Sequence, residues 1–203
     1  MKHLKPEDIL PLAEYSERRR EFFEAHMEYV NRYRRVRLGQ KVTLIFENHH
    51  TAWFRIQELL CIGRIDEPNL VQQELELANR FLQEPDILQA AMIIRVENEA
   101  RFREELQPWK QFQGDHLCLV LGTHRYPAKL VTCRPEDRAV GTSHWVQFSV
   151  DKIGKQMLAD LAKPAFLMLH CPETTQETLV LSEETRLSLV DDLKGSDSGH
   201  HAA

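Results

Sequence analysis

Hydrophobic residues in the first 85 positions recur mostly with the period of a helix. Over residues 6–34 they return every three, four or seven positions, which is typical of a long amphipathic helix. Over residues 35–46 the period changes to two, and Gly39 with Gln40 interrupts it, so a bent strand or hairpin is predicted there. Helical spacing returns over residues 49–63, and again from residue 66 until a proline at residue 85 ends it.

The second half of the chain alternates short apolar runs with turns. Because short turns join strands that pair antiparallel, the pattern predicts an α+β fold. In this fold a helical N-terminal half with one strand or hairpin is followed by a mostly antiparallel sheet with flanking helices. Strands are predicted over residues 90–96, 117–121, 128–132, 145–150, 165–170 and 178–181, and helices over residues 97–109, 153–161 and 182–193.

The chain length and composition fit one ordinary globular domain. The chain has 203 residues, of which 42% are hydrophobic and 28% are charged. We expect a single domain over residues 1–194. Residues 195–203 contain Gly, Ser, Asp, His and Ala with nothing large to bury, so a disordered tail is predicted there.

The charge distribution argues against a dedicated nucleic-acid-binding protein. The net charge is -5, although residues 1–41 contain ten Lys or Arg and seven Asp or Glu, a local balance of +3. Nucleic-acid-binding proteins usually carry a strongly basic face, and the acidic remainder would repel a polyanion. No apolar run approaches the roughly 20 residues that span a bilayer, and no apolar leader precedes the first helix, so a cytoplasmic protein without membrane contact is expected.

Polar residues gather where the first extended segment meets the next helix, in the sequence Phe-Glu-Asn-His-His-Thr at residues 46–51. Asn48 has the position of a helix N-cap, with Thr51 in the first turn. Glu47, His50, Gln57 and Glu58 are predicted to converge beside this helix N-terminus, where a metal or an anion can bind.

Glu47, His50 and Glu58 supply one imidazole and two carboxylates. A second imidazole from His144 or His170 would complete a set suited to iron or zinc. The alternative is a capping and hydrogen-bonded network in which these polar side chains satisfy one another.

Four arginines occur within six residues, at Arg32, Arg34, Arg35 and Arg37. Such a strip can bind phosphates or an acidic partner, and nearby tyrosines can stack on bases. Alternatively, these arginines complement a helix dipole and pair with acids of the same half of the chain, for which Glu47, Glu58 and Glu67 are candidates.

A catalytic cysteine is a further alternative. Cys61, Cys118 and Cys171 have a histidine near them in sequence or in the predicted fold, in His50, His116 and His170, but no activating cation stands beside Cys171. The sequence contains no Cys-x-x-Cys pair and none of the common nucleotide-binding or hydrolase motifs.

Several short motifs occur together over most of the chain. They are Arg34-Arg35-Val36-x-Leu38-Gly39, Thr43-x-x-Phe46-Glu47-Asn48-x-x-Thr51, Ile56-Gln57-Glu58-Leu59-Leu60, Glu74-Leu75, Ala91-Met92-Ile93-Ile94, Val146-Gln147-Phe148 and His170-x-Pro172. This combination, densest between Arg34 and Leu75, resembles a bacterial domain-of-unknown-function family, number 3501.

The sequence departs from the family pattern at two acidic positions. Gly63 stands where the family usually has a carboxylate, and Arg95 stands where its strand tends to end in Glu. A family site built on those acids is weakened here. The resemblance also implies a cellular context, since family members are often encoded beside rubrerythrin-like proteins and iron–sulfur oxidoreductases, which suggests electron transfer or peroxide defence.

Two main hypotheses follow. The first is a non-enzymatic accessory or binding protein of a redox or oxidative-stress system, with rubrerythrin-like or iron–sulfur proteins as partners. The second is a metal-binding redox enzyme with a Glu/His site, and nucleic-acid binding through residues 32–37 is a further alternative. The predicted binding residues are Arg34, Arg35, Arg37, Glu47, Asn48, Thr51, Gln57 and Glu58, and the predicted metal ligands are Glu47, His50, Glu58, His144 and His170.

Overall fold

A curved antiparallel sheet organises the molecule. A computed structural model of the chain describes residues 3–80, 82, 86–131, 142–170 and 177–194. These residues form one eight-stranded sheet in the order β1-β2-β3-β6-β5-β4-β7-β8, and every neighbouring pair is antiparallel. The strands are β1 (Arg35–Leu38), β2 (Val42–Phe46), β3 (Ile87–Ile94), β4 (Leu117–Leu121), β5 (His124–Leu130), β6 (Ser143–Ser149), β7 (Ala165–Leu169) and β8 (Glu177–Val180).

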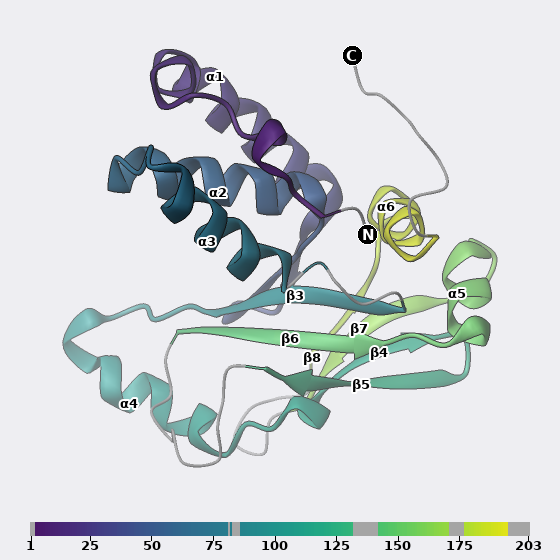
Figure 1. Cartoon of the computed structure of the whole chain (residues 1–203). Coiled ribbons are helices and arrows are strands. Elements are labelled where there is room, and N and C mark those ends of the chain that lie inside the picture. The colour runs from purple at the N-terminus through teal and green to yellow at the C-terminus, as the bar shows by residue number, and fades with distance from the viewer. Residues whose placement is uncertain (1–2, 81, 83–85, 132–141, 171–176, 195–203) are drawn as a thin grey trace.

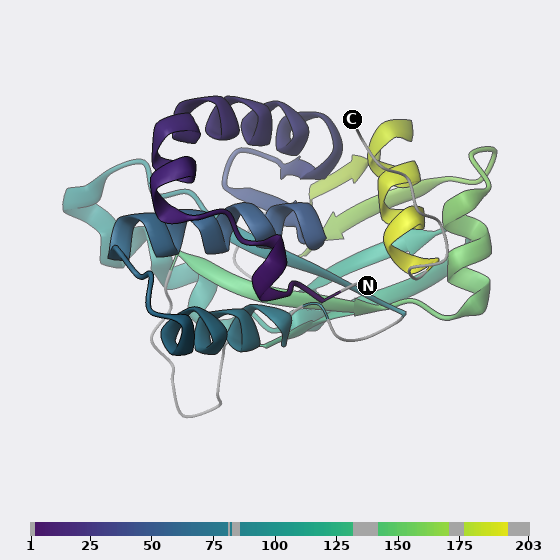
Figure 2. The same ribbon diagram turned by 45° about the horizontal axis from the view of Figure 1, so that its top comes forward.

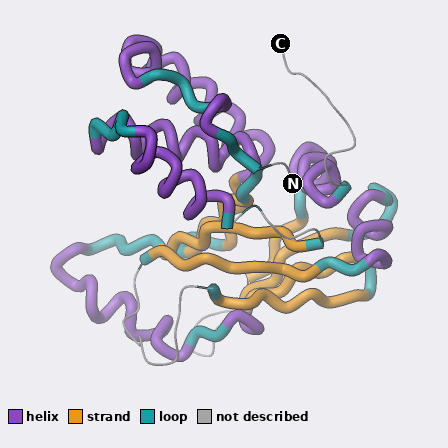
Figure 3. The backbone as a smooth tube through the Cα atoms, viewed as in Figure 1, coloured by secondary structure: helices purple, strands orange, loops and turns teal. Residues whose placement is uncertain are grey.

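Three helices form a layer on one side of the sheet (Figures 1 and 3). They are α1 (Leu12–Tyr29), extended by a π-helical turn at Val30–Arg34, α2 (His49–Gly63) and α3 (Pro68–Asn79). Leu4, Ala52, Ile56, Leu60, Leu75 and Leu82 form a small core of their own in this layer. Figure 2 shows the three helices side by side above the strands.

The larger core lies on the other face of the sheet. Strand residues with alternating spacing point into it, for example Val42, Leu44 and Phe46 of β2, because successive side chains of a strand face opposite ways. Helix α5 (Lys152–Ala159) contributes Leu158, and α6 (Glu183–Leu193) contributes Leu189 and other residues. The curvature of the sheet brings its first strand, β1, into contact with its last, β8.

The α+β class and the antiparallel sheet are confirmed, but the predicted division into a helical half and a sheet half is partly wrong. Strands β1 and β2 belong to the same sheet as the later strands, since Leu44 of β2 pairs with Met92 of β3. Residues this far apart are joined by long-range packing, which a local hydrophobic pattern does not report.

Two predicted helices are interrupted by proline. Residues 6–34 do not form one helix, because a 3₁₀ turn at Pro6–Asp8 is followed by extended backbone and α1 starts only after Pro11. Within the predicted helix 97–109, only α4 (Phe102–Leu106) is α-helical, between 3₁₀ turns at Glu99–Arg101 and Gln107–Gln111. Proline fixes its own φ, lacks an N–H and restricts the residue before it.

Gly39 forms the predicted turn between β1 and β2 with φ of 57°, a left-handed conformation that favours glycine.

In the described part of the chain no helix is long and apolar enough to cross a membrane. The predicted tail at 195–203, Pro85, Cys171 and the end of the strand predicted at 128–132 lie outside the described residues.

Candidate functional site

The stretch at residues 46–51 begins a helix, as its capping pattern predicts. The Asn48 side chain accepts a hydrogen bond from the Thr51 N–H at 3.1 Å, and the Asn48 N–H donates to the Thr51 hydroxyl at 2.8 Å. This reciprocal pair satisfies two backbone N–H donors at the start of α2. Much of the polarity of this stretch is therefore used in forming the helix.

Arg34 ends the helical segment after α1 and is buried, with 2% of its surface exposed. Its guanidinium donates to the Asp192 carboxylate on α6 and to the Tyr29 hydroxyl at 3.0 Å. The Asn48 amide donates to the same hydroxyl at 2.8 Å. Burial raises the pKa of Asp192, and the attraction of Arg34 and a hydrogen bond from Asn48 offset part of that rise. These contacts join α1, α2 and α6.

Glu47 extends this buried network along α2. Its carboxylate accepts hydrogen bonds from the Thr51 hydroxyl at 2.7 Å and from the Arg55 guanidinium at 2.5 Å. Burial raises the pKa of Glu47, and Arg55, Thr51 and Arg34 counteract it. The Arg55 guanidinium also lies 4.7 Å from the centre of the Trp145 ring of β6. Glu47 thus fastens α2 to the sheet.

Glu58 contacts α1 and lies apart from the network around Glu47. It accepts two hydrogen bonds from Arg19, at 2.9 and 2.8 Å, and one from the Tyr15 hydroxyl at 3.0 Å. Since a helix rises about 1.5 Å per residue, Glu58 is roughly 12 Å further along the axis of α2 than His50. Glu58 holds α1 against α2 and does not join Glu47.

His50 lies in an aromatic stack between α1 and α2. Its ring is 4.2 Å from the ring of Tyr29 and 5.7 Å from that of His26, which in turn stacks on Phe54 at 3.8 Å. Burial lowers the pKa of both imidazoles, that of His26 to about 4, and nearby cations lower them further. Both rings are therefore neutral at physiological pH.

The remaining predicted metal ligands lie elsewhere. His144 is on β6 next to Trp145, which faces Arg55 and α2, so strand alternation directs His144 to the opposite face. His170 follows β7, is exposed, and donates its backbone N–H to the His116 carbonyl at 2.8 Å. Within the described ranges, no three His, Cys, Asp or Glu side chains are placed to hold a metal ion.

Gln57 is buried in α2 with 1% of its surface exposed, and its side-chain nitrogen has no hydrogen-bond partner in the described structure.

Of the candidate cysteines, Cys61 lies 3.5 Å from the Ser16 hydroxyl. Cys118 is buried in β4, where burial raises the pKa of its thiol. A thiol in that environment is a weaker nucleophile, and Cys171 lies outside the described residues.

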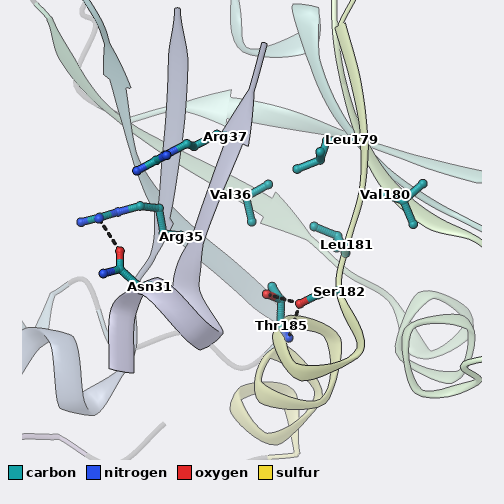
Figure 4. A pocket seen from close by; sticks show the side chains of 9 residues that line it. All are labelled: Asn31, Arg35, Val36, Arg37, Leu179, Val180, Leu181, Ser182 and Thr185. Carbon is teal, nitrogen blue, oxygen red and sulfur yellow. Dashed lines mark hydrogen bonds between the residues drawn. The ribbon is translucent and has the colours of Figure 1, made fainter. Parts of the chain in front are cut away.

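Arg34 has a different role from Arg35 and Arg37. Arg34 forms the buried ion pair with Asp192. Arg35 and Arg37 lie on one side of β1, and Val36 lies on the other (Figure 4). Arg35 donates to the Asn31 side chain at 2.5 Å. Burial lowers the pKa of Arg35, and the like charge of Arg37 lowers it further. In the described part of the chain neither cation forms an ion pair with a carboxylate.

A pocket of about 510 Å³ lies beside these arginines, between the two outermost strands of the sheet. We call it the β1–β8 seam. Val36 faces Leu179 and Leu181 across it, and hydroxyls stand at its end (Figure 4). Its lining residues are Asn31, Arg35, Val36, Arg37, Leu179, Val180, Leu181, Ser182 and Thr185.

Sequence reasoning found only one wall of this pocket. The sequence predicts Arg35 and Arg37 as binding residues, whereas at Leu179, Leu181 and Thr185 it predicts only secondary structure. The sequence likewise does not indicate Asp192 and Arg55, although they complete the buried network. The strand predicted at residues 178–181 is the last strand in the sequence, but its place in the sequence does not identify the strands beside it.

Comparison with known proteins adds a family and a fold. A family model described as a protein of unknown function, DUF3501, matches residues 3–193. A crystal structure of a novel protein of unknown function from Burkholderia pseudomallei K96243 is similar, with a TM-score of 0.85 and 22% sequence identity over 95% of this chain and 100% of that chain. No curated protein matches the sequence.

Proposed function

Because the chain belongs to the DUF3501 family, whose description assigns no activity, we propose from its own surface that it is an accessory protein that binds an anionic partner at the β1–β8 seam. The observation that carries the proposal is the pair of cations on β1. Arg35 and Arg37 stand beside a pocket without an ion pair to a described carboxylate. Two adjacent like charges repel each other, and an anion placed against both relieves that repulsion.

The pocket has the size and lining of a binding site. Its volume of about 510 Å³ falls within the roughly 300–1,000 Å³ of ligand sites in proteins. Val36, Leu179 and Leu181 offer apolar surface, while Asn31 and the hydroxyls of Ser182 and Thr185 offer hydrogen bonds. A mixture of apolar surface and a few polar groups supports binding with a fixed orientation.

The resemblance to family 3501 suggests the kind of partner. The proposal includes an accessory role in a redox or oxidative-stress system, with a rubrerythrin-like or iron–sulfur protein as the bound protein. This part depends on the family resemblance alone, and the experiment below tests it together with the site.

The test is affinity capture from a lysate of the source organism with three forms of the protein. They are the unchanged chain, Arg35→Glu with Arg37→Glu, and the matched control Arg103→Glu, which reverses an exposed charge on α4. We expect a redox protein to be captured by the unchanged chain and the control, and lost with the double variant. A captured set that is the same for all three forms would contradict the proposal.

Folding has to be preserved for this comparison to be meaningful. Arg35 and Arg37 make no ion pair in the described structure, so reversing them should change the free energy of unfolding by less than about 1 kcal/mol. Urea denaturation of the double variant checks this expectation.

A further inference from the structure

We propose that the occupant of the β1–β8 seam is an extended segment of a partner protein, with alternating acidic and apolar side chains, which pairs with the free edge of β1. This inference rests on the proposed function and names the chemistry of the partner. A strand that adds to a sheet edge is recognised through its backbone, and alternate side-chain contacts select its sequence.

Strands β1 and β8 are the two edge strands of the sheet. Among the described residues, β1 pairs only with β2, and β8 pairs only with β7. The two strands are in contact, but within the described residues no backbone hydrogen bond joins them. Edge strands present unpaired N–H and C=O groups, which are a template for pairing with another chain.

The seam is filled near Gly39 and hollow toward α6. At the Gly39 end the Glu177 side chain fills the space beside the turn, since a Cβ placed on Gly39 would lie 2.6 Å from its carboxylate. Toward Leu181 and Thr185 lies the pocket of about 510 Å³. A segment that enters from the α6 end therefore finds space along β1 (Figure 4).

The alternation of side chains along β1 dictates the pattern of side chains in the bound segment. Val36 and Leu181 are buried in the core, and Leu179, with 36% of its surface exposed, points toward Val36 (Figure 4). Arg35 and Arg37 face the other side of β1. Side chains directly opposite each other on paired strands interact, so apolar residues fit beside Val36 and acidic residues fit beside the arginines.

The same alternation disfavours a second copy of this chain at the edge of β1. Two β1 strands paired antiparallel would place arginines of one copy near arginines of the other. Like charges opposite each other destabilise a strand pair, whereas opposite charges stabilise it. Charge complementarity thus favours an acidic segment over self-association.

The test is a titration of the full chain with a fluorescent heptapeptide, acetyl-Glu-Val-Glu-Val-Glu-Val-Glu-amide, followed by anisotropy. Matched probes replace Glu by Lys, methylate alternate backbone nitrogens, or replace every Val by Glu. We expect binding of the first peptide and a loss of at least about tenfold in affinity with each matched probe. A similar loss is expected with Arg35→Glu and Arg37→Glu, but not with Arg103→Glu.

Several results would overturn the inference. If the methylated peptide binds as tightly as the unmodified peptide, the segment does not pair through its backbone. If the all-Glu peptide binds as tightly, the site is a nonspecific cationic surface. If none of the peptides binds, or if the protein forms a dimer whose assembly depends on β1, an acidic segment is not the occupant of the seam. If partner capture depends on Arg35 and Arg37 while none of these peptides binds, the proposed function stands and the strand-pairing inference falls.

Discussion

Arg34 and Arg35 are neighbours in sequence and have opposite roles in the structure. Arg34 is buried against Asp192 and Tyr29, whereas Arg35 lies at the edge of a pocket. The sequence selects both residues as candidates because both are arginines in one strip. It does not separate them, since the carboxylate that captures Arg34 comes from α6, which the chain brings close only in the folded state.

Replacing Arg34 with Met tests the structural role of the buried pair. The change leaves the Asp192 carboxylate buried without its cation, which typically costs about 3–5 kcal/mol of unfolding free energy. Urea denaturation measures the loss. Arg32→Met is the matched control, because Arg32 is exposed and lies over the ring of Tyr33. Equal destabilisation by the two variants would contradict a structural role for Arg34.

The stacked histidines predict a loss of stability in acid. The pKa of His26 is about 4 in the folded protein, below its ordinary value of 6.5, because it is buried and faces His50, Arg35 and Arg55, with Glu58 opposing them. The unfolded chain therefore takes up a proton first as the pH falls. Stability contributed by neutral His26 is complete above about pH 6.5 and is lost progressively as the pH falls toward 4.

His26→Phe removes this titration and keeps a flat ring on Phe54. We expect its unfolding free energy to fall less steeply between pH 6.5 and 4 than that of the unchanged protein. Urea denaturation across this range measures the slope. Identical slopes would mean that His26 does not contribute to the pH dependence.

At the scale of elements, Arg186 joins two helices by a set of backbone contacts. Its side chain, in α6, is 5% exposed and donates to the carbonyls of Met157, Leu158, Asp160 and Lys163 at 2.7 to 3.2 Å. The last carbonyls of a helix have no partner within that helix. Arg186 therefore caps the C-terminal end of α5 from outside.

Arg186→Lys keeps the charge but loses the planar set of donors. Because the buried carbonyls lose partners, we expect a loss of at least about 2 kcal/mol in unfolding free energy. Amide hydrogen exchange should rise mainly in α5. The matched change Arg103→Lys, at an exposed position, should leave both measurements unchanged, and similar effects of the two changes would refute the capping role.

Local signals in the sequence predict elements better than they predict how elements meet. The cap of α2 at Asn48 and the turn at Gly39 were both predicted, because each depends on residues close together in the chain. The pairing of β2 with β3, and the contact between β1 and β8, depend on residues far apart. For that reason one wall of the seam was identified and the other was not.

At the scale of the whole molecule, the acidic protein presents a small cationic area at the open part of its sheet. The net charge is -5, yet Arg35 and Arg37 stand beside the seam without a carboxylate partner in the described structure. An acidic segment is attracted to these two cations. Such a charge distribution directs an acidic segment to the β1–β8 seam. Its binding should weaken at high salt, since salt screens exposed charges.

Amide hydrogen exchange at β1 and β8 tests the central claim, that this sheet edge is open and receives a partner strand. In the free protein, amides of these two strands that point into the seam should exchange faster than amides of β2 and β7. The acidic heptapeptide should slow exchange in β1 of the unchanged protein, but not in the double variant of Arg35 and Arg37. Full protection of β1 and β8 in the free monomer would show that the sheet is already closed and would contradict the account.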